Sequence, residues 1–179
     1  LGLVNDVTTK WEAGADNGTS PSTATIAVDP ADSANKVIQL TEGGNTAQQW
    51  VRAALSPTAA IEQGKTATLF LRFRATEQID SSFGLTDVDS PSTNWGDFRL
   101  QFVVHNAVQM RDGSSVRDLV YAATGAAVPW NPDWYYLGLV ITNDPAAPVI
   151  KVYINQSGVD ATEADRCVRA DLPTQDTFG

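Results

Sequence analysis

The sequence predicts an all-β protein, a β-sandwich in which two antiparallel sheets pack face to face. Short segments alternate between apolar and polar residues, as in strands whose successive side chains point to opposite faces. Turn-forming residues separate these segments at strand-like intervals. No segment of convincing length has the helical period, and the sequence contains no internal repeat. At 179 residues the chain is long enough for a sizeable core, and we expect one sandwich domain over residues 1–179.

Ten segments carry the strand pattern, and about ten strands in one domain are typical of a jelly roll. In chain order they are 23–28, 36–40, 48–53, 66–75, 82–87, 98–104, 107–111, 116–121, 134–142 and 149–155. The turn formers Asp29, Pro30 and Asp32 separate the first two segments. The third segment places Trp50 and Arg52 on one face.

The fourth segment, 66–75, alternates most cleanly. Leu69, Leu71 and Phe73 fall on one face, which we expect to point to the core. The opposite face holds Thr68, Phe70, Arg72 and Arg74. The fifth segment, 82–87, ends before turn formers at 89–92.

The sixth and seventh segments predict a β-hairpin with one apolar and one polar face. Matching the faces sets the register, because a slip of one residue would turn arginines into the core. The expected pairs are Leu100 with Met110, Phe102 with Val108, Gln101 with Gln109 and Arg99 with Arg111. Residues 104–106 then form the loop, which places His105 off the polar face.

The last three segments, 116–121, 134–142 and 149–155, complete the two expected sheets. Trp134 opens the ninth segment, and we expect it in the core. In the tenth segment, Ile150, Val152 and Ile154 alternate with Lys151, Tyr153 and Asn155.

The composition narrows the class of protein. The formal net charge is −9 and the pI is about 4.4, which argues against nucleic acid or an anionic membrane as a bulk partner. Few Lys, Glu, Met and Cys residues, with many Thr, Ala, Asp, Asn and Gly, favour a secreted, extracellular protein. Cys167 is the single cysteine, so no internal disulfide forms. No apolar run approaches the roughly 20 residues of a membrane span.

Four segments in order resemble the laminin-G-like, concanavalin-A-like jelly roll found in bacterial carbohydrate-binding modules. They are the strand 67–75, the hairpin ending at 108–113, the aromatic strand 134–140 and the closing strand 150–155, and the resemblance covers residues 36 to 158. It implies an all-β sandwich that binds a polysaccharide. The same fold also hosts glycosidases, lyases and adhesion modules, so the resemblance is weaker for function than for fold.

Arginines occupy the polar-face positions of several expected strands, although the chain is acidic. The planar guanidinium fork suits carboxylate and sulfate groups, so we expect a concave face that binds an acidic or neutral polysaccharide. Trp95 and Trp130 fall in loops and suit stacking against sugar rings. The expected ligand-binding residues are Trp50, Arg52, Arg72, Arg74, Trp95, Arg99, Gln101, Gln109, Arg111 and Trp130. The alternative is a solvated face whose arginines pair with Asp or Glu.

Two enzymatic functions are alternatives for this fold. A jelly-roll polysaccharide lyase that acts on a uronate glycan would use His105 and Tyr153 with the arginines. Its family places glutamine and histidine two residues apart, whereas Gln101 and His105 are four apart, and the predicted loop removes His105 from the face. A glycosidase needs two carboxylates on the cleft face, and no such strand motif occurs.

We also expect that Asp29 and Asp32, with Glu12 or Asp171, hold a structural Ca²⁺, as loop carboxylates do in such jelly rolls. The alternative is that these acids only form turns. The sequence therefore predicts a monomeric, non-catalytic carbohydrate-binding module of an extracellular polysaccharide-degrading system, tethered to other domains of a larger enzyme. The lyase, and an adhesion or structural domain without a sugar ligand, stay as alternatives.

Overall fold

The computed structural model describes residues 12–15, 23–30, 32–41, 49–52, 61–76, 81–86, 98–104, 106–112, 115–146, 149–158 and 160–173. The chain divides into two compact units, Leu1–Ala59 and Ala60–Gly179. In the described part of the first unit, β1 (Glu12–Ala15) pairs with β4 (Gln49–Arg52), and β2 (Thr23–Asp29) pairs with β3 (Asp32–Thr41). Both pairs are antiparallel. The single domain over 1–179 stays a prediction.

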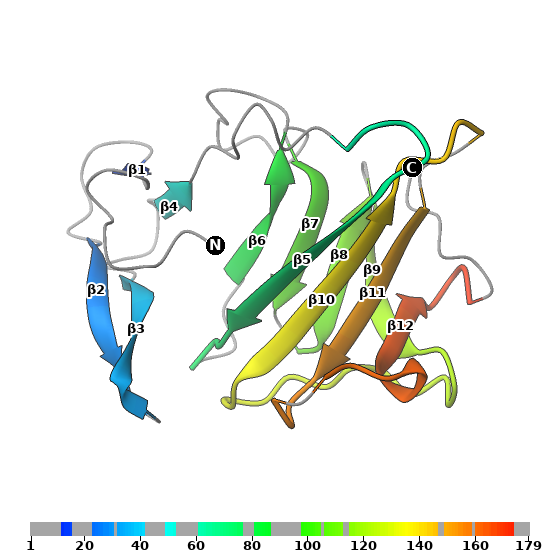
Figure 1. The fold of residues 1–179 in the computed structure, drawn as a ribbon. Helices are drawn as coiled ribbons and strands as arrows, with labels where there is room; N and C mark the ends of the chain where they lie inside the picture. The colour runs from blue at the N-terminus through cyan, green and yellow to red at the C-terminus, as the bar shows by residue number, and fades with distance from the viewer. Residues whose placement is uncertain are drawn as a thin grey trace. The chain divides into compact units, whose positions relative to one another are not determined.

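The second unit is built on one antiparallel sheet of eight strands in the order β5-β10-β11-β12-β9-β8-β7-β6 (Figure 1). The strands are β5 (Thr66–Phe73), β6 (Ser81–Thr86), β7 (Phe98–Val104), β8 (Val108–Asp112), β9 (Ser115–Tyr121), β10 (Tyr135–Thr142), β11 (Val149–Asn155) and β12 (Arg166–Arg169). A 3₁₀ turn at Glu163–Asp165 leads into β12.

This sheet curls around its apolar face, so that its two halves form two layers. One cluster of buried side chains takes Phe102 from β7 and Met110 from β8, and also Leu137 from β10 and Val152 from β11. In Figure 1, β5, β10, β11 and β12 lie in front of β9, β8, β7 and β6. The halves join where β12 pairs with both β11 and β9. The predicted all-β antiparallel sandwich is confirmed, with one curled sheet supplying both layers of this unit.

Burial agrees with the predicted faces of β5 and β11 at most positions; the exceptions are Leu71, expected in the core but 38% exposed, and Asn155, expected on the polar face but buried. Leu69 and Phe73 pack against the core, whereas Phe70 between them is 70% exposed. Val152 and Ile154 are fully buried. The Phe73 ring also stacks on Tyr135, with ring centroids 5.2 Å apart, which ties β5 to β10.

Each of the ten predicted segments corresponds to an observed strand, but the hairpin register differs by two residues. The observed pairs are Gln101 with Arg111, Phe102 with Met110, Val103 with Gln109 and Val104 with Val108. The predicted pairs, including Arg99 with Arg111, are therefore wrong. A shift of two residues keeps every side chain on its predicted face, so matching faces does not detect it. Val104 is 2% exposed and stays paired within the strand, which moves the connection to 105–107.

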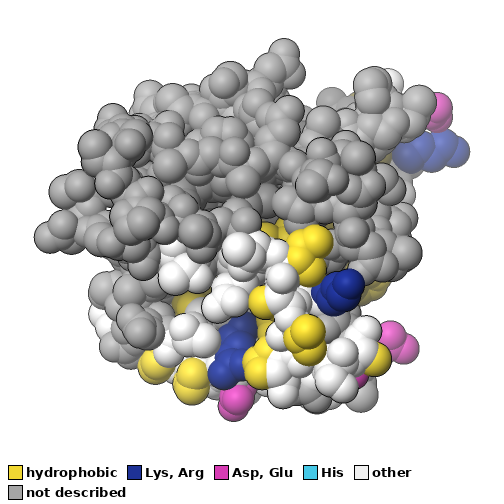
Figure 2. All heavy atoms as spheres, turned by 90° about the vertical axis from the view of Figure 1, so that its left-hand side faces the viewer, with side chains coloured by type: hydrophobic (Ala, Val, Ile, Leu, Met, Phe, Trp, Pro, Cys, Tyr) yellow, Lys and Arg dark blue, Asp and Glu magenta, His cyan; other side chains and the backbone are white. Residues whose placement is uncertain are grey.

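Large hydrophobic side chains are exposed at a few described positions. Ile26 and Val28 of β2 are 39% and 56% exposed, and Leu71 of β5 is 38% exposed. In the view of Figure 2, hydrophobic side chains lie next to Lys or Arg side chains on the described part of the surface. Within the described ranges, no helix has the length and apolar character needed to cross a membrane.

Candidate functional site

The outward-pointing side chains of β5, β10 and β11 form a surface that we call the aromatic face. Strand register arranges them in rows, because paired residues on neighbouring strands share one face of a sheet. One row pairs Arg72 with Tyr136, and the next joins Phe70, Gly138 and Tyr153. The aromatic face is defined by Phe70, Arg72, Trp134, Tyr136, Gly138, Lys151 and Tyr153.

Arg72 stacks on two aromatic rings of this face. Its guanidinium carbon lies 4.2 Å from the centroid of the Trp134 ring and 5.3 Å from that of Tyr136. A guanidinium over an indole face is attracted by the ring quadrupole, and more strongly when water is partly excluded. All three residues are half-buried. The stack therefore fixes the plane of the Arg72 fork.

The turn that precedes Trp134 is anchored at Asn131 and Pro132. Arg74 donates from Nε to the carbonyl oxygen of Pro132 over 2.6 Å. The side-chain amides of Asn131 and Gln156 donate to each other, at 2.8 and 2.7 Å. Arg74, predicted as a ligand contact, thus positions the turn that places Trp134 beside Arg72.

Gly138 leaves room for an aromatic ring at the centre of the face. A Cβ added to Gly138 would lie 3.5 Å from a ring carbon of Phe70 and 3.7 Å from Cβ of Tyr153. The Phe70 ring therefore leans over the glycine and covers its backbone. With 70% of the residue exposed, the ring offers a large apolar surface to solvent.

Tyr153 is the last residue of the row that contains Phe70 and Gly138, and polar contacts hold its side chain. Its hydroxyl donates to Oε1 of Glu163 over 3.0 Å, and Oε2 of Glu163 lies 3.4 Å from Nε of Arg166. A capping box between Thr162 and Asp165 orders the turn that carries Glu163. The Tyr153 hydroxyl is therefore oriented toward a carboxylate.

The predicted arginine and glutamine ligands fall into two groups. Arg72 and Arg74 belong to the β5 end of the sheet, whereas Gln109 and Arg111 are on β8, with β10, β11, β12 and β9 between them. Cross-strand register puts Arg72, Gln109 and Arg111 on the same outer face of the sheet. Because the sheet curls around the opposite face, this outer face is convex. The two groups therefore do not converge on one concave surface.

For the other residues predicted to contact the ligand, the structure describes fewer side chains. The side chains of Trp50 and Arg52 on β4, and of Arg99 and Gln101 on β7, lie outside the described residues, as do Trp95 and His105. Trp130 is half-buried, and its indole Nε1 is buried without a hydrogen-bond partner. Gln109 donates to Asp118 over 2.7 Å. Of the two residues that a lyase would use, Tyr153 lies on the aromatic face and His105 lies outside the described residues.

Sequence reasoning missed three of the aromatic residues of the aromatic face. Trp134 was expected in the core, but it lies one residue before β10 and stacks on Arg72. Phe70 and Tyr136 were not named as ligand contacts. A usable signal was present at Phe70, since a large aromatic residue occupies a polar-face position of a cleanly alternating strand.

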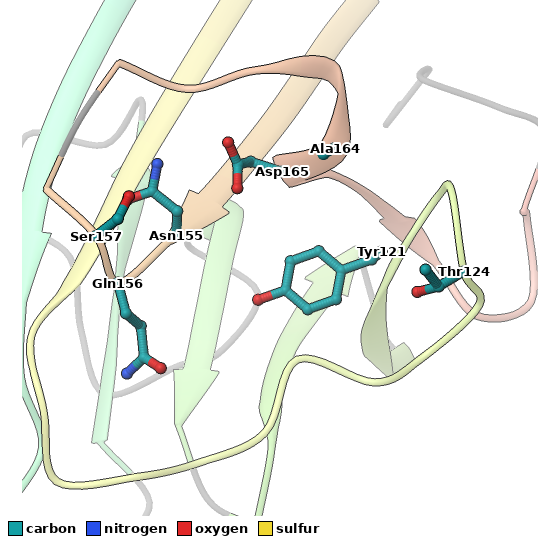
Figure 3. A pocket seen from close by; sticks show the side chains of 7 residues that line it. All are labelled: Tyr121, Thr124, Asn155, Gln156, Ser157, Ala164 and Asp165. Carbon is teal, nitrogen blue, oxygen red and sulfur yellow. The ribbon is translucent and has the colours of Figure 1, made fainter.

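A shallow depression of about 380 Å³ lies at the end of β9 and β11 (Figure 3). Its lining is Tyr121, Thr124, Asn155, Gln156, Ser157, Ala164 and Asp165. Burial, followed by nearby negative groups, raises the pKa of Tyr121, which keeps its hydroxyl neutral. Asp165 accepts hydrogen bonds from Thr162, and Asn155 accepts one from the backbone of Gly158. These polar groups are largely engaged within the protein.

Cys167 lies in the core. It is fully buried, and burial raises the pKa of its thiol to about 12. The thiol is therefore protonated at neutral pH, which makes it a poor nucleophile.

The predicted calcium ligands Asp29 and Asp32 are the last residue of β2 and the first of β3, and they pair with each other on either side of the turn. Asp32 accepts the backbone N–H of Ala34 over 3.0 Å, and Asp29 is buried. Asp171, proposed as a further ligand, is bound by Arg169 at 2.7 Å and lies 3.3 Å from Arg117. In the described ranges no group of three His, Cys, Asp or Glu side chains is arranged to hold a metal ion. The calcium site stays a prediction.

Comparison with protein-family models, curated proteins and solved structures finds no match to this chain. The resemblance to laminin-G-like domains stays a prediction. The functional argument therefore depends on the geometry of the aromatic face.

Proposed function

We propose that this protein is a non-catalytic carbohydrate-binding domain whose aromatic face stacks against the sugar rings of a polysaccharide. The observation that carries the proposal is Phe70, an aromatic side chain 70% exposed above Gly138 and next to the Arg72–Trp134 stack. Folding leaves this ring in water, so binding a ligand would remove apolar surface from solvent.

The chemistry of the face suits a sugar. One face of a pyranose ring is largely C–H surface, which packs well against an aromatic ring. Hydroxyl groups around the ring edge need donors and acceptors, and the hydrogen-bonded Tyr153 hydroxyl and Glu163 carboxylate lie at the end of the row that begins with Phe70. Binding sites that combine apolar contact with a few fixed polar groups are typical of small-molecule and cofactor recognition.

The setting of the domain is part of the same proposal. The composition supports an extracellular protein, and we propose that it acts as a monomer tethered to other domains of a polysaccharide-degrading enzyme. The polysaccharide is the partner, with no role for nucleic acid or membrane.

Affinity electrophoresis in gels that contain different neutral and acidic polysaccharides tests the proposal. We expect at least one polysaccharide to retard the protein, and Phe70→Ala to abolish most of the retardation. Leu71→Ala is the matched control, because Leu71 is the next residue of β5 and points to the opposite face. No retardation in any gel, or equal loss in both variants, would contradict the proposal.

The same polysaccharides also test whether the protein is a lyase and not a binding domain. Incubation while absorbance is followed for unsaturated uronate should give no signal. A signal that Tyr153→Phe abolishes would replace the binding proposal with lyase activity.

A further inference from the structure

The row of the aromatic face that contains Phe70 ends at an exposed carboxylate. Register places Phe70, Gly138, Tyr153 and Arg166 in one row across β5, β10, β11 and β12. Glu163 lies beside the last two, because its Oε1 accepts from the Tyr153 hydroxyl over 3.0 Å and its Oε2 lies 3.4 Å from Nε of Arg166. The Glu163 side chain is 74% exposed. The row therefore joins an apolar ring to a carboxylate that faces solvent.

Each oxygen of the Glu163 carboxylate keeps room for a further hydrogen bond. An ionised carboxylate offers about four acceptor positions, two on each oxygen. Tyr153 occupies one position on Oε1, and Arg166 lies next to Oε2. Among the described residues, no other hydrogen bond or ion pair to this side chain is recorded. Two neighbouring acceptor oxygens are therefore open to donors from a ligand.

The protein holds this carboxylate in place before any ligand arrives. The 3₁₀ turn at Glu163–Asp165 begins with a capping box between Thr162 and Asp165, which orders the backbone of Glu163. The contacts with Tyr153 and Arg166 then restrict the side chain. A group that is already ordered loses less conformational freedom on binding, so its hydrogen bonds contribute more to affinity.

The spacing of the row sets how a sugar chain can lie on it. Phe70 and Tyr153 are two strand spacings apart, about 10 Å between Cα atoms, which is wider than one sugar ring. A chain with one unit stacked on Phe70 and running across the strands therefore brings a following unit to Tyr153 and Glu163. Two adjacent hydroxyl groups on that unit match the two carboxylate oxygens, and hydrogen bonds to an ionised acceptor are the stronger kind.

We infer that Glu163 is a specificity-determining residue that accepts hydrogen bonds from two adjacent hydroxyl groups of the bound sugar chain. The ligand class is therefore a glycan whose units carry an unsubstituted vicinal diol. An O-alkyl or O-acyl group at this position removes a donor, and a sulfate ester adds repulsion from the carboxylate. This inference rests on the proposed carbohydrate binding and adds the selectivity of the same face.

The test compares native polysaccharides with their O-methylated forms, which keep the C–H surface of the ring and lose hydroxyl donors. Xylan, β-glucan, galactan and mannan, each native and O-methylated, are used in affinity gels with the wild-type protein. We expect at least one native polymer to bind about fivefold more tightly than its O-methylated form, because methylation removes hydrogen bonds to a charged acceptor.

Variants locate the effect at Glu163. Glu163→Gln keeps the size of the side chain and removes its charge, and hydrogen bonds to a neutral acceptor are roughly half as strong. It should weaken binding of the native polymer about 2- to 5-fold and leave binding of the O-methylated polymer unchanged. A residue that only supported Tyr153 would weaken both equally. Glu62→Gln is the matched control, because Glu62 is an exposed glutamate in the turn before β5, and we expect no change there.

The outcomes separate the two proposals. Equal affinity for the native and O-methylated forms would overturn the selectivity for a free diol and leave carbohydrate binding intact. Equal weakening of both forms by Glu163→Gln, or equal effects of the Glu163 and Glu62 variants, would also overturn it. Absence of binding to every native and O-methylated polymer would overturn carbohydrate binding itself.

Discussion

Replacing Phe70 with alanine should weaken ligand binding while lowering the free energy of unfolding only slightly. Full burial of a phenylalanine side chain contributes about 1.5–3 kcal/mol. Because Phe70 is 70% exposed, only about a third of that contribution is present, so Phe70→Ala should lower the free energy of unfolding by about 0.5–1 kcal/mol. Phe102 is 1% exposed in the core, and Phe102→Ala should cost about 3–5 kcal/mol.

Urea unfolding, followed by intrinsic fluorescence, measures both losses on the same scale. Polysaccharide affinity should fall more in Phe70→Ala than in Phe102→Ala. The loss of the one stacked ring at Phe70 should weaken binding about 2- to 10-fold. Phe102→Ala should bind normally at temperatures where it remains folded. If Phe70→Ala destabilises the protein as much as Phe102→Ala, the Phe70 ring belongs to the core and is not an exposed surface for ligand binding.

Three further predictions concern stability. Arg72→Met and Trp134→Leu, alone and together, should show a coupling free energy of about 0.5–1 kcal/mol in urea unfolding, and additive losses would contradict the stack. The hydrogen bonds from Arg169 hold the pKa of Asp171 below its ordinary value. Its stabilising contribution is therefore present above about pH 4 and is lost as the pH falls through the lower folded pKa. When the urea midpoint is measured against pH, Asp171→Asn should make its decrease at acidic pH less steep. An unchanged decrease would refute the assignment. The Cys167 pKa of about 12 lies above its ordinary value of 9.0, so the unfolded chain ionises first and stability should fall by about 1.4 kcal/mol at pH 10. Cys167→Ala should remove that fall, and an identical alkaline slope in the variant would contradict it.

Alternation along the chain was enough to predict most strands and their faces. In β5, the period of two separates Leu69 and Phe73 from Phe70 and Arg72, and burial follows that separation. The same signal cannot set the hairpin register, since shifts of two residues preserve the faces. β12 was missed because its four residues, between Arg166 and Arg169, are too short to show a period.

The candidate site was predicted only in part. Arg72 and Arg111 were correctly assigned to the polar side of their strands, but alternation says nothing about which way a sheet curls. The position of Trp134 was missed for a different reason. It precedes β10 by one residue, where the turn held by Arg74 and Asn131 decides its direction.

Backbone amide shift mapping during titration with an oligosaccharide, taken from a polysaccharide that retards the protein in affinity gels, tests the aromatic face most directly. We predict that the largest shifts cluster on β5, β10 and β11, in the row of Phe70, Gly138 and Tyr153, and that Phe70→Ala raises the oligosaccharide concentration needed to produce them about 2- to 10-fold. Shifts centred instead on Gln109 and Arg111 of β8, or no shifts at saturating oligosaccharide, would contradict the assignment of this face as the binding surface.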